Sequence, residues 1–348
     1  MATTYKTFLN NDIASTRTLL HESVPVTGTI VSGTYSDSNI KNYSHGLFQS
    51  VYDYPYLSSS ANHIFDITCG YADTSALSSS AVSDGVASSD IRDKINMYNE
   101  VAQVLVGHDV TGAIQKFDQD GDISGGGTKM KEVYVLNFAR LLSKDEIKKG
   151  SFTINLATGT VNSPVDFALV DEIGDYNAEN DFRVNSPAGE YGILYTSSAT
   201  PNANSGVGLL YYQAGMCVLS ASAFTNENAL FSGSESVSGT LSGSSIQANA
   251  DALRARMENV SFNNTTELNS TIYFCRVNHN EFNYSANPTY LSSSQIVVKQ
   301  QQTDAPVSYI TTVGMYSADN ELLAVAKLSE PLKKDPNNEL ILRVRLDY

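Results

Sequence analysis

The sequence of 348 residues has no tryptophan and only three cysteines. Cys69, Cys217 and Cys275 lie far apart, without the paired spacing of a zinc site or a disulfide framework. An odd number of cysteines in this arrangement argues against a secreted protein held together by disulfides. Cys69 and Cys275 fall within strand-like segments, where a free thiol behaves as a small hydrophobic side chain.

Basic residues are also scarce, because 22 lysines and arginines stand against 37 acidic residues, a formal net charge of −15. Binding a nucleic-acid backbone requires a cationic surface, so we expect no nucleic-acid partner. No apolar segment approaches the roughly 20 residues that cross a bilayer. The first residues, MATTYKTFLNND, contain neither a basic-then-apolar leader nor a glycine for myristoylation. We expect a protein that is made in the cytoplasm and has no membrane partner.

Tyrosine is abundant, with 20 residues. It is favoured at interfaces because it covers apolar area at low entropic cost and keeps a polar tip. The alternative, that β-rich folds simply contain much tyrosine, is equally open. The interface candidates are Tyr52, Tyr54, Tyr56, Tyr309, Tyr316 and Tyr348.

The last residues of the chain alternate strictly in polarity. Leu340, Leu342, Val344, Leu346 and Tyr348 fall on one face, whereas the residues between them include two arginines and an aspartate. This period of two predicts a half-buried strand that continues to the final residue. We expect the segment Tyr309–Tyr348 to form strands of one shared sheet, with the leucines facing inward.

Other strands are predicted from alternating or continuous apolar segments. The segment Val133–Ala139 is almost continuously apolar, which is typical of a central strand covered on both faces. In Asn62–Tyr71, the side chains of Phe65, Ile67 and Cys69 share one face. Further strands are predicted at residues 26–35, 151–156, 209–219 and 270–277.

Helices are predicted where apolar residues recur at helical spacing. The clearest begins at Ser89 or Asp90 and ends at Gly107, with an apolar stripe that should lie on a sheet. Others are predicted over Asn11–Glu22, Ser143–Lys149 and Ile246–Met257.

Strands in succession with few helices predict an α+β fold that is mainly β, with antiparallel or mixed sheets and about three short helices. We expect four segments: an N-terminal helical arm (1–23), a β-rich domain with one amphipathic helix (24–156), a loop or hairpin insertion (157–208) and a C-terminal β-rich domain (209–348). The insertion is assigned because Gly, Asn, Ser and Pro dominate there with little periodicity.

The best small motif is FDQDGDISGGGT, residues 117–128. Asp118, Asp120 and Asp122 alternate as carboxylates do when their oxygens converge on calcium. The EF-hand pattern nevertheless fails, because Ile123 and Lys129 stand where Gly and Glu are required. The three aspartates are therefore a weak calcium candidate. We expect an acidic structural turn whose carboxylates point to solvent, and no metal.

Motifs for catalysis or cofactors are incomplete. A phosphate-binding loop that began at Gly121 would need a lysine at residue 127, where the chain has Gly127. No serine lies in a G-x-S-x-G turn. The histidines show no metal-binding spacing. His63 and Asp66 lie close along one strand, but their opposite parity predicts that they face different sides of a sheet. We predict no enzyme activity and no cofactor.

Four segments resemble structural proteins of T-even-type tailed phages, especially those of marine cyanobacteria. Lys41–Thr68 (KNYSHGLFQSVYDYPYLSSSANHIFDIT) and Lys116–Ile154 (KFDQDGDISGGGTKMKEVYVLNFARLLSKDEIKKGSFTI) are similar to a virion protein described as VrlC-like. The terminal segment, with YITTVGMY and ELLAVAKLS, resembles tail- and baseplate-associated proteins, and Ser261–Tyr290 is similar to a segment that recurs with it in several large virion proteins of this group.

The resemblance implies a structural subunit of the virion, most plainly of the tail or baseplate, that assembles in the host cytoplasm. The partners expected from it are other virion proteins, such as tail, baseplate or neck subunits, with multiple copies in each particle. A neck, collar or head-surface protein is an alternative. A virion-surface module that binds or depolymerises glycans through the Asp118–Asp122 loop is another.

Overall fold

The structure is a computed structural model, and it describes residues 6–26, 37–78, 88–157, 170–197, 199–202, 204–223, 241, 243–285, 291–292, 295–296, 301 and 303–348. The chain divides into two compact units. Unit 1 comprises residues 1–19 and 267–348, and unit 2 comprises residues 20–266. Strands β1 (Ile13–Val26) and β15 (Met257–Val277) contribute residues to both units.

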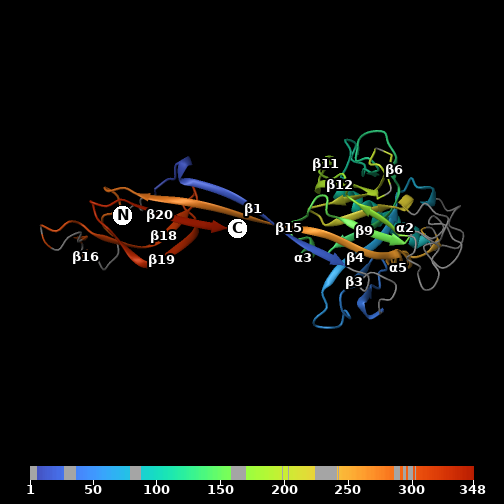
Figure 1. The fold of residues 1–348 in the computed structure, drawn as a ribbon, viewed down its shortest axis with the longest axis horizontal. Helices are drawn as coiled ribbons and strands as arrows, with labels where there is room; N and C mark the ends of the chain where they lie inside the picture. Colours follow the sequence, from blue (N-terminus) through green and yellow to red (C-terminus); the bar gives the residue numbers. More distant parts are fainter. Residues whose placement is uncertain are drawn as a thin grey trace. The chain divides into compact units, whose positions relative to one another are not determined.

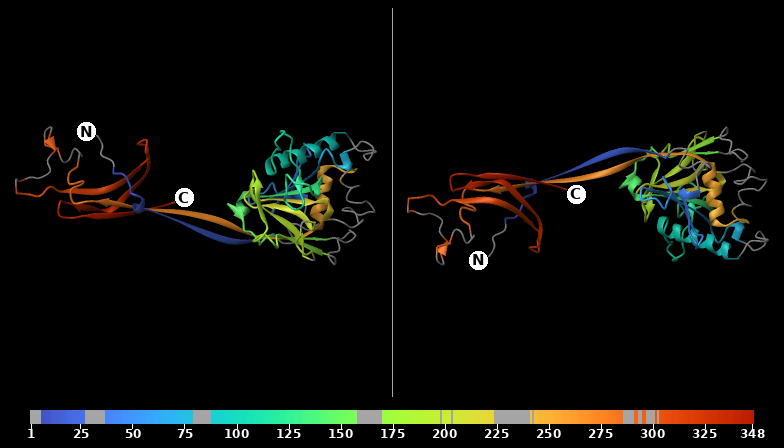
Figure 2. Two further views of the ribbon diagram at one scale, coloured as in Figure 1. Left: turned by 90° about the horizontal axis from the view of Figure 1, so that it is seen from above. Right: turned by 90° about the horizontal axis from the view of Figure 1, so that it is seen from below.

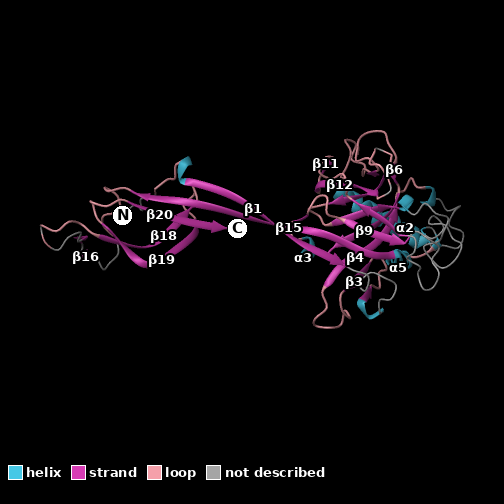
Figure 3. Cartoon of the chain, in the orientation of Figure 1, coloured by secondary structure: helices cyan, strands magenta, loops and turns pink. Residues whose placement is uncertain are grey.

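The described elements are mainly strands (Figure 3), and the pairings among β2 to β20 are antiparallel. The strands of unit 2 are β2 (Ile40–Asn42), β3 (Gln49–Tyr52), β4 (His63–Tyr71), β5 (Phe117–Asp118), β6 (Lys129–Met130), β7 (Glu132–Phe138), β8 (Glu146–Ile147), β9 (Thr153–Ala157), β10 (Val170–Gly174), β11 (Phe182–Ser186), β12 (Gly189–Thr196), β13 (Gly206–Tyr211) and β14 (Met216–Ser220). The α-helices are α2 (Ser88–Leu105), α3 (Arg140–Ser143) and α5 (Ile246–Arg256). This confirms the mainly β, α+β class.

The main sheet has the strand order β1-β15-β9-β10-β12-β13-β14-β7-β4-β3-β2, with β8, β11 and β20 (Leu340–Asp347) paired beside this path. Its central strands are buried on both faces. On β7, Tyr134, Leu136 and Phe138 join one apolar cluster, whereas Val133 and Val135 join the other. The prediction of a doubly covered central strand is confirmed. Phe65, Ile67 and Cys69 share the first cluster, also as predicted.

The two longer helices of unit 2 lie beside the main sheet (Figures 1 and 2), and α2 also packs against the first cluster through Ile91 and Ile95. Helix α5 places Ile246, Ala250 and Leu253 in the first cluster, and α2 places Tyr98 and Leu105 in the second. Both helices were predicted from their spacing, with boundaries within two residues of the observed ones. The helices are therefore held on unit 2 by apolar burial, which is the main stabilising term for an amphipathic helix.

Lys94 of α2 is fully buried. Its Nζ atom donates hydrogen bonds to the carbonyls of Leu241, at 2.6 Å, and Ser244, just before α5 begins. Burial lowers the pKa of this ammonium group. The lysine thereby ties α2 to the entry of α5, and its buried ammonium group has carbonyl partners there.

Unit 1 is built from the outer part of β15, the strand β20 and the hairpin of β18 (Ser308–Tyr316) and β19 (Leu322–Lys334). Two shorter strands, β16 (Leu291–Ser292) and β17 (Gln295–Ile296), pair with each other. β20 pairs with β15 in an uninterrupted register from Leu340 opposite Val277 to Asp347 opposite Ser270. The predicted terminal strand and its alternation are thus confirmed.

The shared sheet predicted for Tyr309–Tyr348 is wrong. β20 belongs to the main sheet, whereas β18 and β19 form a separate two-stranded sheet. The inward leucines of β20 are only half-buried, and Tyr348 is exposed. Its backbone is nevertheless held, because its N–H donates to the Asn269 carbonyl at 2.8 Å and its own carbonyl accepts from the Asn269 N–H at 3.0 Å.

Two predicted helices are wrong. Residues 13–22 form most of β1, and residues 11–12 end a short 3-10 helix, η1 (Asn10–Asp12). Pairing with β15 supplies backbone hydrogen bonds that outweigh the weak apolar stripe of this segment. Residues 143–149 contain the end of α3 and the strand β8, since Ile147 pairs with Asn264 and is fully buried. Lys144 between them adopts φ 54°, which ends the helix.

The predicted domain boundaries also differ from the observed division. Strands β10, β12 and β13 place the described part of residues 157–208 in the main sheet as antiparallel strands, which agrees with the predicted hairpins, but the segment belongs to unit 2 and is not a separate domain. Their glycines permit close approach: a Cβ on Gly208 would lie 2.6 Å from the Val218 carbonyl oxygen. The predicted strand at residues 26–35 lies outside the described residues, apart from Val26 at the end of β1.

Candidate functional site

The Asp118–Asp122 loop begins and ends on a two-residue ladder, in which Phe117 pairs with Met130 and Asp118 with Lys129. Phe117 and Met130 are buried in the second apolar cluster, and this anchors both ends of the loop to unit 2. Asp118 follows directly and is only 1% exposed. A carboxylate buried to this degree requires a partner for its charge.

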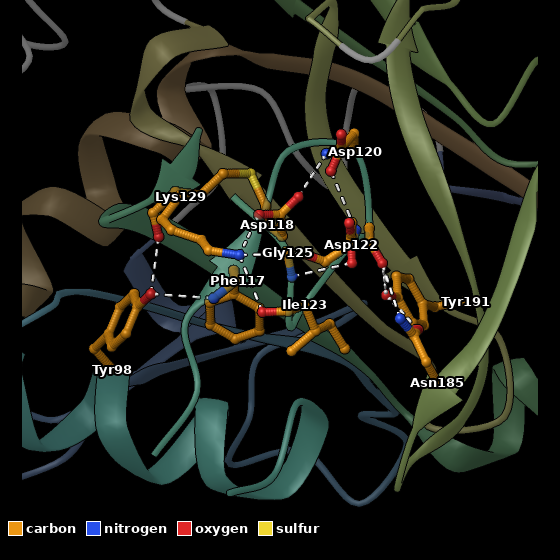
Figure 4. Close-up of polar contacts among 12 residues, drawn as sticks. Tyr98, Phe117, Asp118, Asp120, Asp122, Ile123, Gly125, Lys129, Asn185 and Tyr191 are labelled. Carbon is orange, nitrogen blue, oxygen red and sulfur yellow. Dashed lines mark hydrogen bonds and ion pairs between the residues drawn. The ribbon is translucent and has the colours of Figure 1, made fainter. Parts of the chain in front are cut away.

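Lys129 supplies that partner (Figure 4). Its Nζ atom lies 2.5 Å from Oδ2 of Asp118 and donates hydrogen bonds to the carbonyls of Asp122, at 3.2 Å, and Ile123, at 3.0 Å. One carboxylate oxygen and two backbone carbonyls therefore converge on an ammonium group. The position that a bound cation would take in a calcium loop is occupied by a cation of the chain itself.

The aspartates also organise the loop backbone in steps of two or three residues. Oδ1 of Asp118 accepts from the N–H of Asp120, Oδ1 of Asp120 from the N–H of Asp122, and Oδ1 of Asp122 from the N–H of Gly125, each at 3.1 Å. Such local bonds are the reason aspartate favours turns. The expectation that all three carboxylates point to solvent is wrong for Asp118, whereas Asp122 is exposed as expected.

Side chains of β11 and β12 hold the loop from outside. The hydroxyl of Tyr191 and the amide of Asn185 each donate to the Gly121 carbonyl at 3.0 Å. Arg183 donates to the Asp120 carbonyl at 3.2 Å. Gly121 adopts φ +76°, a conformation suited to glycine. These contacts attach the backbone of the loop to β11 and β12.

The carboxyl groups of Asp118 and Asp120 shift each other's pKa. Burial, reinforced by a hydrogen bond with Asp120, raises the pKa of Asp118 in spite of Lys129. The same hydrogen bond lowers the pKa of Asp120. Within the described part of the chain, no group of three or more His, Cys, Asp or Glu side chains is arranged to hold a metal ion.

A second polar group lies on β3 and β4, and it corrects an expectation. Nε2 of His63 lies 2.8 Å from Oδ1 of Asp66, which also accepts from the hydroxyl of Ser50 at 2.5 Å. A β-bulge explains this arrangement. Tyr52 pairs with His63 and Val51 with Phe65, so the extra residue on β4 brings His63 and Asp66 to the same face.

This arrangement does not form a catalytic triad. Both Ser50 and His63 contact the same oxygen of Asp66, whereas a nucleophilic serine must contact the histidine itself. The group connects neighbouring strands through side chains. We infer no chemistry from it.

The six interface tyrosines are divided between the two units. Tyr52, Tyr54 and Tyr56 lie in unit 2 on and after β3, where the ring of Tyr52 is 6.4 Å from that of Tyr56 and 5.4 Å from that of His63. Tyr309, Tyr316 and Tyr348 lie in unit 1, and all three are exposed. Three of the six candidates therefore lie in each unit.

Sequence reasoning missed the aliphatic residues around Tyr316. Leu322, Leu323 and Val325 of β19 are all exposed, in a segment, ELLAVAKL, that the sequence predicted only as a strand. The available signal was the alanines at 324 and 326, which face the other side of the hairpin and leave the larger side chains outside.

Comparisons with known proteins found no matching family model, curated protein or solved structure. Among the described residues, no helix is long and apolar enough to span a membrane.

Proposed function

We propose that this chain is a structural subunit of a tailed-phage particle, with the tail or baseplate as its proposed location. It acts by permanent association with other virion proteins. The observation that carries the proposal is the small number of buried apolar residues in unit 1. Of the hydrophobic residues that are buried among those described, only Val277 and Met315 belong to unit 1. A unit with so small an interior and many exposed apolar side chains is suited to burial against neighbours.

The resemblance of four segments to structural proteins of T-even-type phages supports the same function. The last of them, Tyr309–Tyr348, contains β19, β20 and all but the first residue of β18, and it carries half of the exposed large apolar residues of unit 1. The exposed large apolar residues of this segment are Tyr309, Tyr316, Leu322, Leu323, Val325, Ile341 and Tyr348. Surface of this kind, when contiguous, marks protein interfaces.

The glycan-binding alternative finds no support in the Asp118–Asp122 loop. Asp118 is buried against Lys129, and the loop carboxylates already accept backbone N–H groups. Polar groups that are satisfied internally offer little binding energy to a sugar hydroxyl. A neck, collar or head-surface location remains an alternative within the structural class.

The test is made in the phage that encodes the chain. Deletion of its gene should give particles that lack a defined tail or baseplate feature under the electron microscope, and complementation should restore that feature. Mass spectrometry of purified wild-type particles should detect the chain in stoichiometric amounts. Purified particles without the chain would overturn the proposal, and a short tag inserted in the chain would distinguish tail, neck and head positions.

A further inference from the structure

The outer face of the β18–β19 hairpin carries a contiguous apolar surface. The register places Tyr316 opposite Leu322 and Gly314 opposite Val325. Tyr316, Leu322 and Val325 are 45%, 53% and 52% exposed. A Cβ added to Gly314 would meet the Tyr316 ring at 3.1 Å and Leu322 at 3.4 Å, which shows that both side chains lie over this glycine. We call Gly314, Tyr316, Leu322 and Val325 the hairpin patch.

The side chains on the two faces of this hairpin are distributed in an unusual way. On the opposite face, Met315 lies across from Ala324, and Val313 lies across from Ala326. The small alanines are thus on the more buried face, whereas the leucine and valine of β19 are on the exposed one. An isolated soluble hairpin would favour the reverse order. This distribution is explained if the hairpin patch is covered in the working state of the protein.

The distribution of charge indicates what covers it. The residues of unit 1 include nine lysines and arginines and ten acidic residues, a net charge of −1, which leaves −14 for residues 20–266. Two copies of a chain with a net charge of −15 repel each other across most of their surface. Unit 1 is the region where two copies can approach with the least repulsion.

The ends of the patch carry complementary charges. Glu321 precedes β19 at one end, and Lys327 lies on the patch face at the other, opposite Thr312; both residues are exposed. If two copies of β19 stack in antiparallel orientation about a two-fold axis, each Lys327 lies over the Glu321 of the other copy. A contact between identical patches must be self-complementary in this way.

We infer that the hairpin patch is a contact surface between two copies of this chain, arranged with antiparallel β19 strands. The inference rests on the proposed function, which it deepens by naming one of the partners. Apolar contact at the centre would be provided by Tyr316, Leu322 and Val325, and pairing at the rim by Glu321 and Lys327. An aromatic and aliphatic centre with a charged rim is the usual anatomy of a protein interface.

Sedimentation velocity of the purified full-length chain over a concentration series tests the inference. The wild-type chain should form a species of twice its 37.6 kDa mass. Leu322→Glu combined with Val325→Glu should raise the dissociation constant by roughly 100-fold or more. The matched control is Leu141→Glu with Val184→Glu, which changes the charge equally at two residues of unit 2 that are 83% and 69% exposed. The control should associate like the wild type.

Charge exchange tests the orientation. Glu321→Lys and Lys327→Glu should each weaken self-association, because each brings like charges together at both ends of the patch. A mixture of these two variants should form a mixed pair more readily than either variant pairs with itself. Absence of a preferred mixed pair would overturn the antiparallel arrangement.

Far-ultraviolet circular dichroism checks that each variant keeps its β structure. If the double glutamate variant does not, Leu322→Ser with Val325→Ser is measured against the same criterion. A wild-type chain that stays monomeric up to about 100 µM would overturn the inference, as would undiminished pairing of the folded patch variant. A monomeric chain whose patch variants fail to enter particles would assign the patch to another virion protein, with the proposed function intact. Absence of the chain from particles would instead overturn the proposed function.

Discussion

The ammonium of Lys129 lies 2.5 Å from the buried carboxylate of Asp118 and closes the loop that these two residues begin and end. In a calcium-binding loop, carboxylate and carbonyl oxygens surround a metal ion. Here the carbonyls of Asp122 and Ile123 and one oxygen of Asp118 surround Lys129. The loop thus obtains its central charge from the chain itself.

Replacement of Lys129 by methionine should destabilise unit 2, because it leaves Asp118 buried without a counter-ion. We expect the free energy of unfolding at pH 7 to fall by about 2–4 kcal/mol in urea titrations. Lys116→Met is the control, since Lys116 lies 3.9 Å from the exposed Asp73. An equal effect of both substitutions would contradict the structural role of Lys129.

The destabilisation by Lys129→Met should depend on pH. Burial already raises the pKa of Asp118, and removal of the ammonium raises it further. A carboxyl whose folded-state pKa is raised favours the folded state when protonated and loses that contribution as the pH rises through its folded-state pKa. The difference between variant and wild type should therefore shrink as the pH is lowered below the pKa of Asp118. A difference that is constant between acidic and neutral pH would contradict this account.

Calcium should have no effect on the melting temperature of the wild-type chain, because Lys129 occupies the centre of the loop. Lys129→Glu removes the ammonium and adds a carboxylate at the position where an EF-hand has one. We expect its melting temperature to rise by roughly a few degrees when calcium is added and to fall again with a chelator. Lys129→Met separates the two effects, since it removes the charge without adding a ligand. A calcium-dependent melting temperature in the wild type would contradict the assignment.

Only part of this site was predictable from the sequence. The alternating aspartates and the mismatch at Lys129 were visible in the sequence. The ion pair was not, because it requires Asp118 and Lys129 to face each other on the β5–β6 ladder. In the same way, the contact of His63 with Asp66 depends on a β-bulge, which a simple alternation of faces does not anticipate.

The fold was predictable where burial is strong. The apolar segments of β4 and β7 and the helical spacing of α2 and α5 gave the right elements, because their side chains fill the two apolar clusters. The errors fall where pairing with a distant strand decides the conformation. The described residues of β1 before Glu22 are almost all exposed, so its apolar residues carry no pattern that reports its partner β15.

Gly70→Ala should disturb the packing of α2 on the sheet. A Cβ at residue 70 would lie 2.5 Å from the carbonyl oxygen of Lys94 and 2.8 Å from the backbone nitrogen of Tyr98. Backbone atoms of a helix cannot move aside without a shift of the helix, so we expect a loss of about 1–3 kcal/mol in the free energy of unfolding. Gly126→Ala, where a Cβ would meet open space, is the control for the loss of a glycine.

Truncation of leucine should have different effects in the two units. Leu194 of β12 is fully buried in the first apolar cluster, and its replacement by alanine should lower the free energy of unfolding by about 2–5 kcal/mol. Leu342 of β20 was expected to face inward, but it is only half-buried. Leu342→Ala should therefore lower the free energy of unfolding of the isolated chain by less than about 1.5 kcal/mol. Equal losses in chemical denaturation would contradict the difference in burial.

The three cysteines should differ in reactivity in the folded chain. All three are free, but Cys69 and Cys217 are buried, whereas Cys275 on β15 is partly accessible. Burial raises the pKa of Cys69 to about 12 and also raises those of Cys217 and Cys275 above the ordinary thiol value. Because the thiolate is the reactive form, alkylation should modify Cys275 first and should accelerate as the pH rises.

Mass spectrometry should find one modified cysteine in the native chain and three after unfolding, and Cys275→Ser should abolish the native reaction. Native modification of Cys217 at the rate of Cys275 would show that the interior of unit 2 opens on the timescale of labelling.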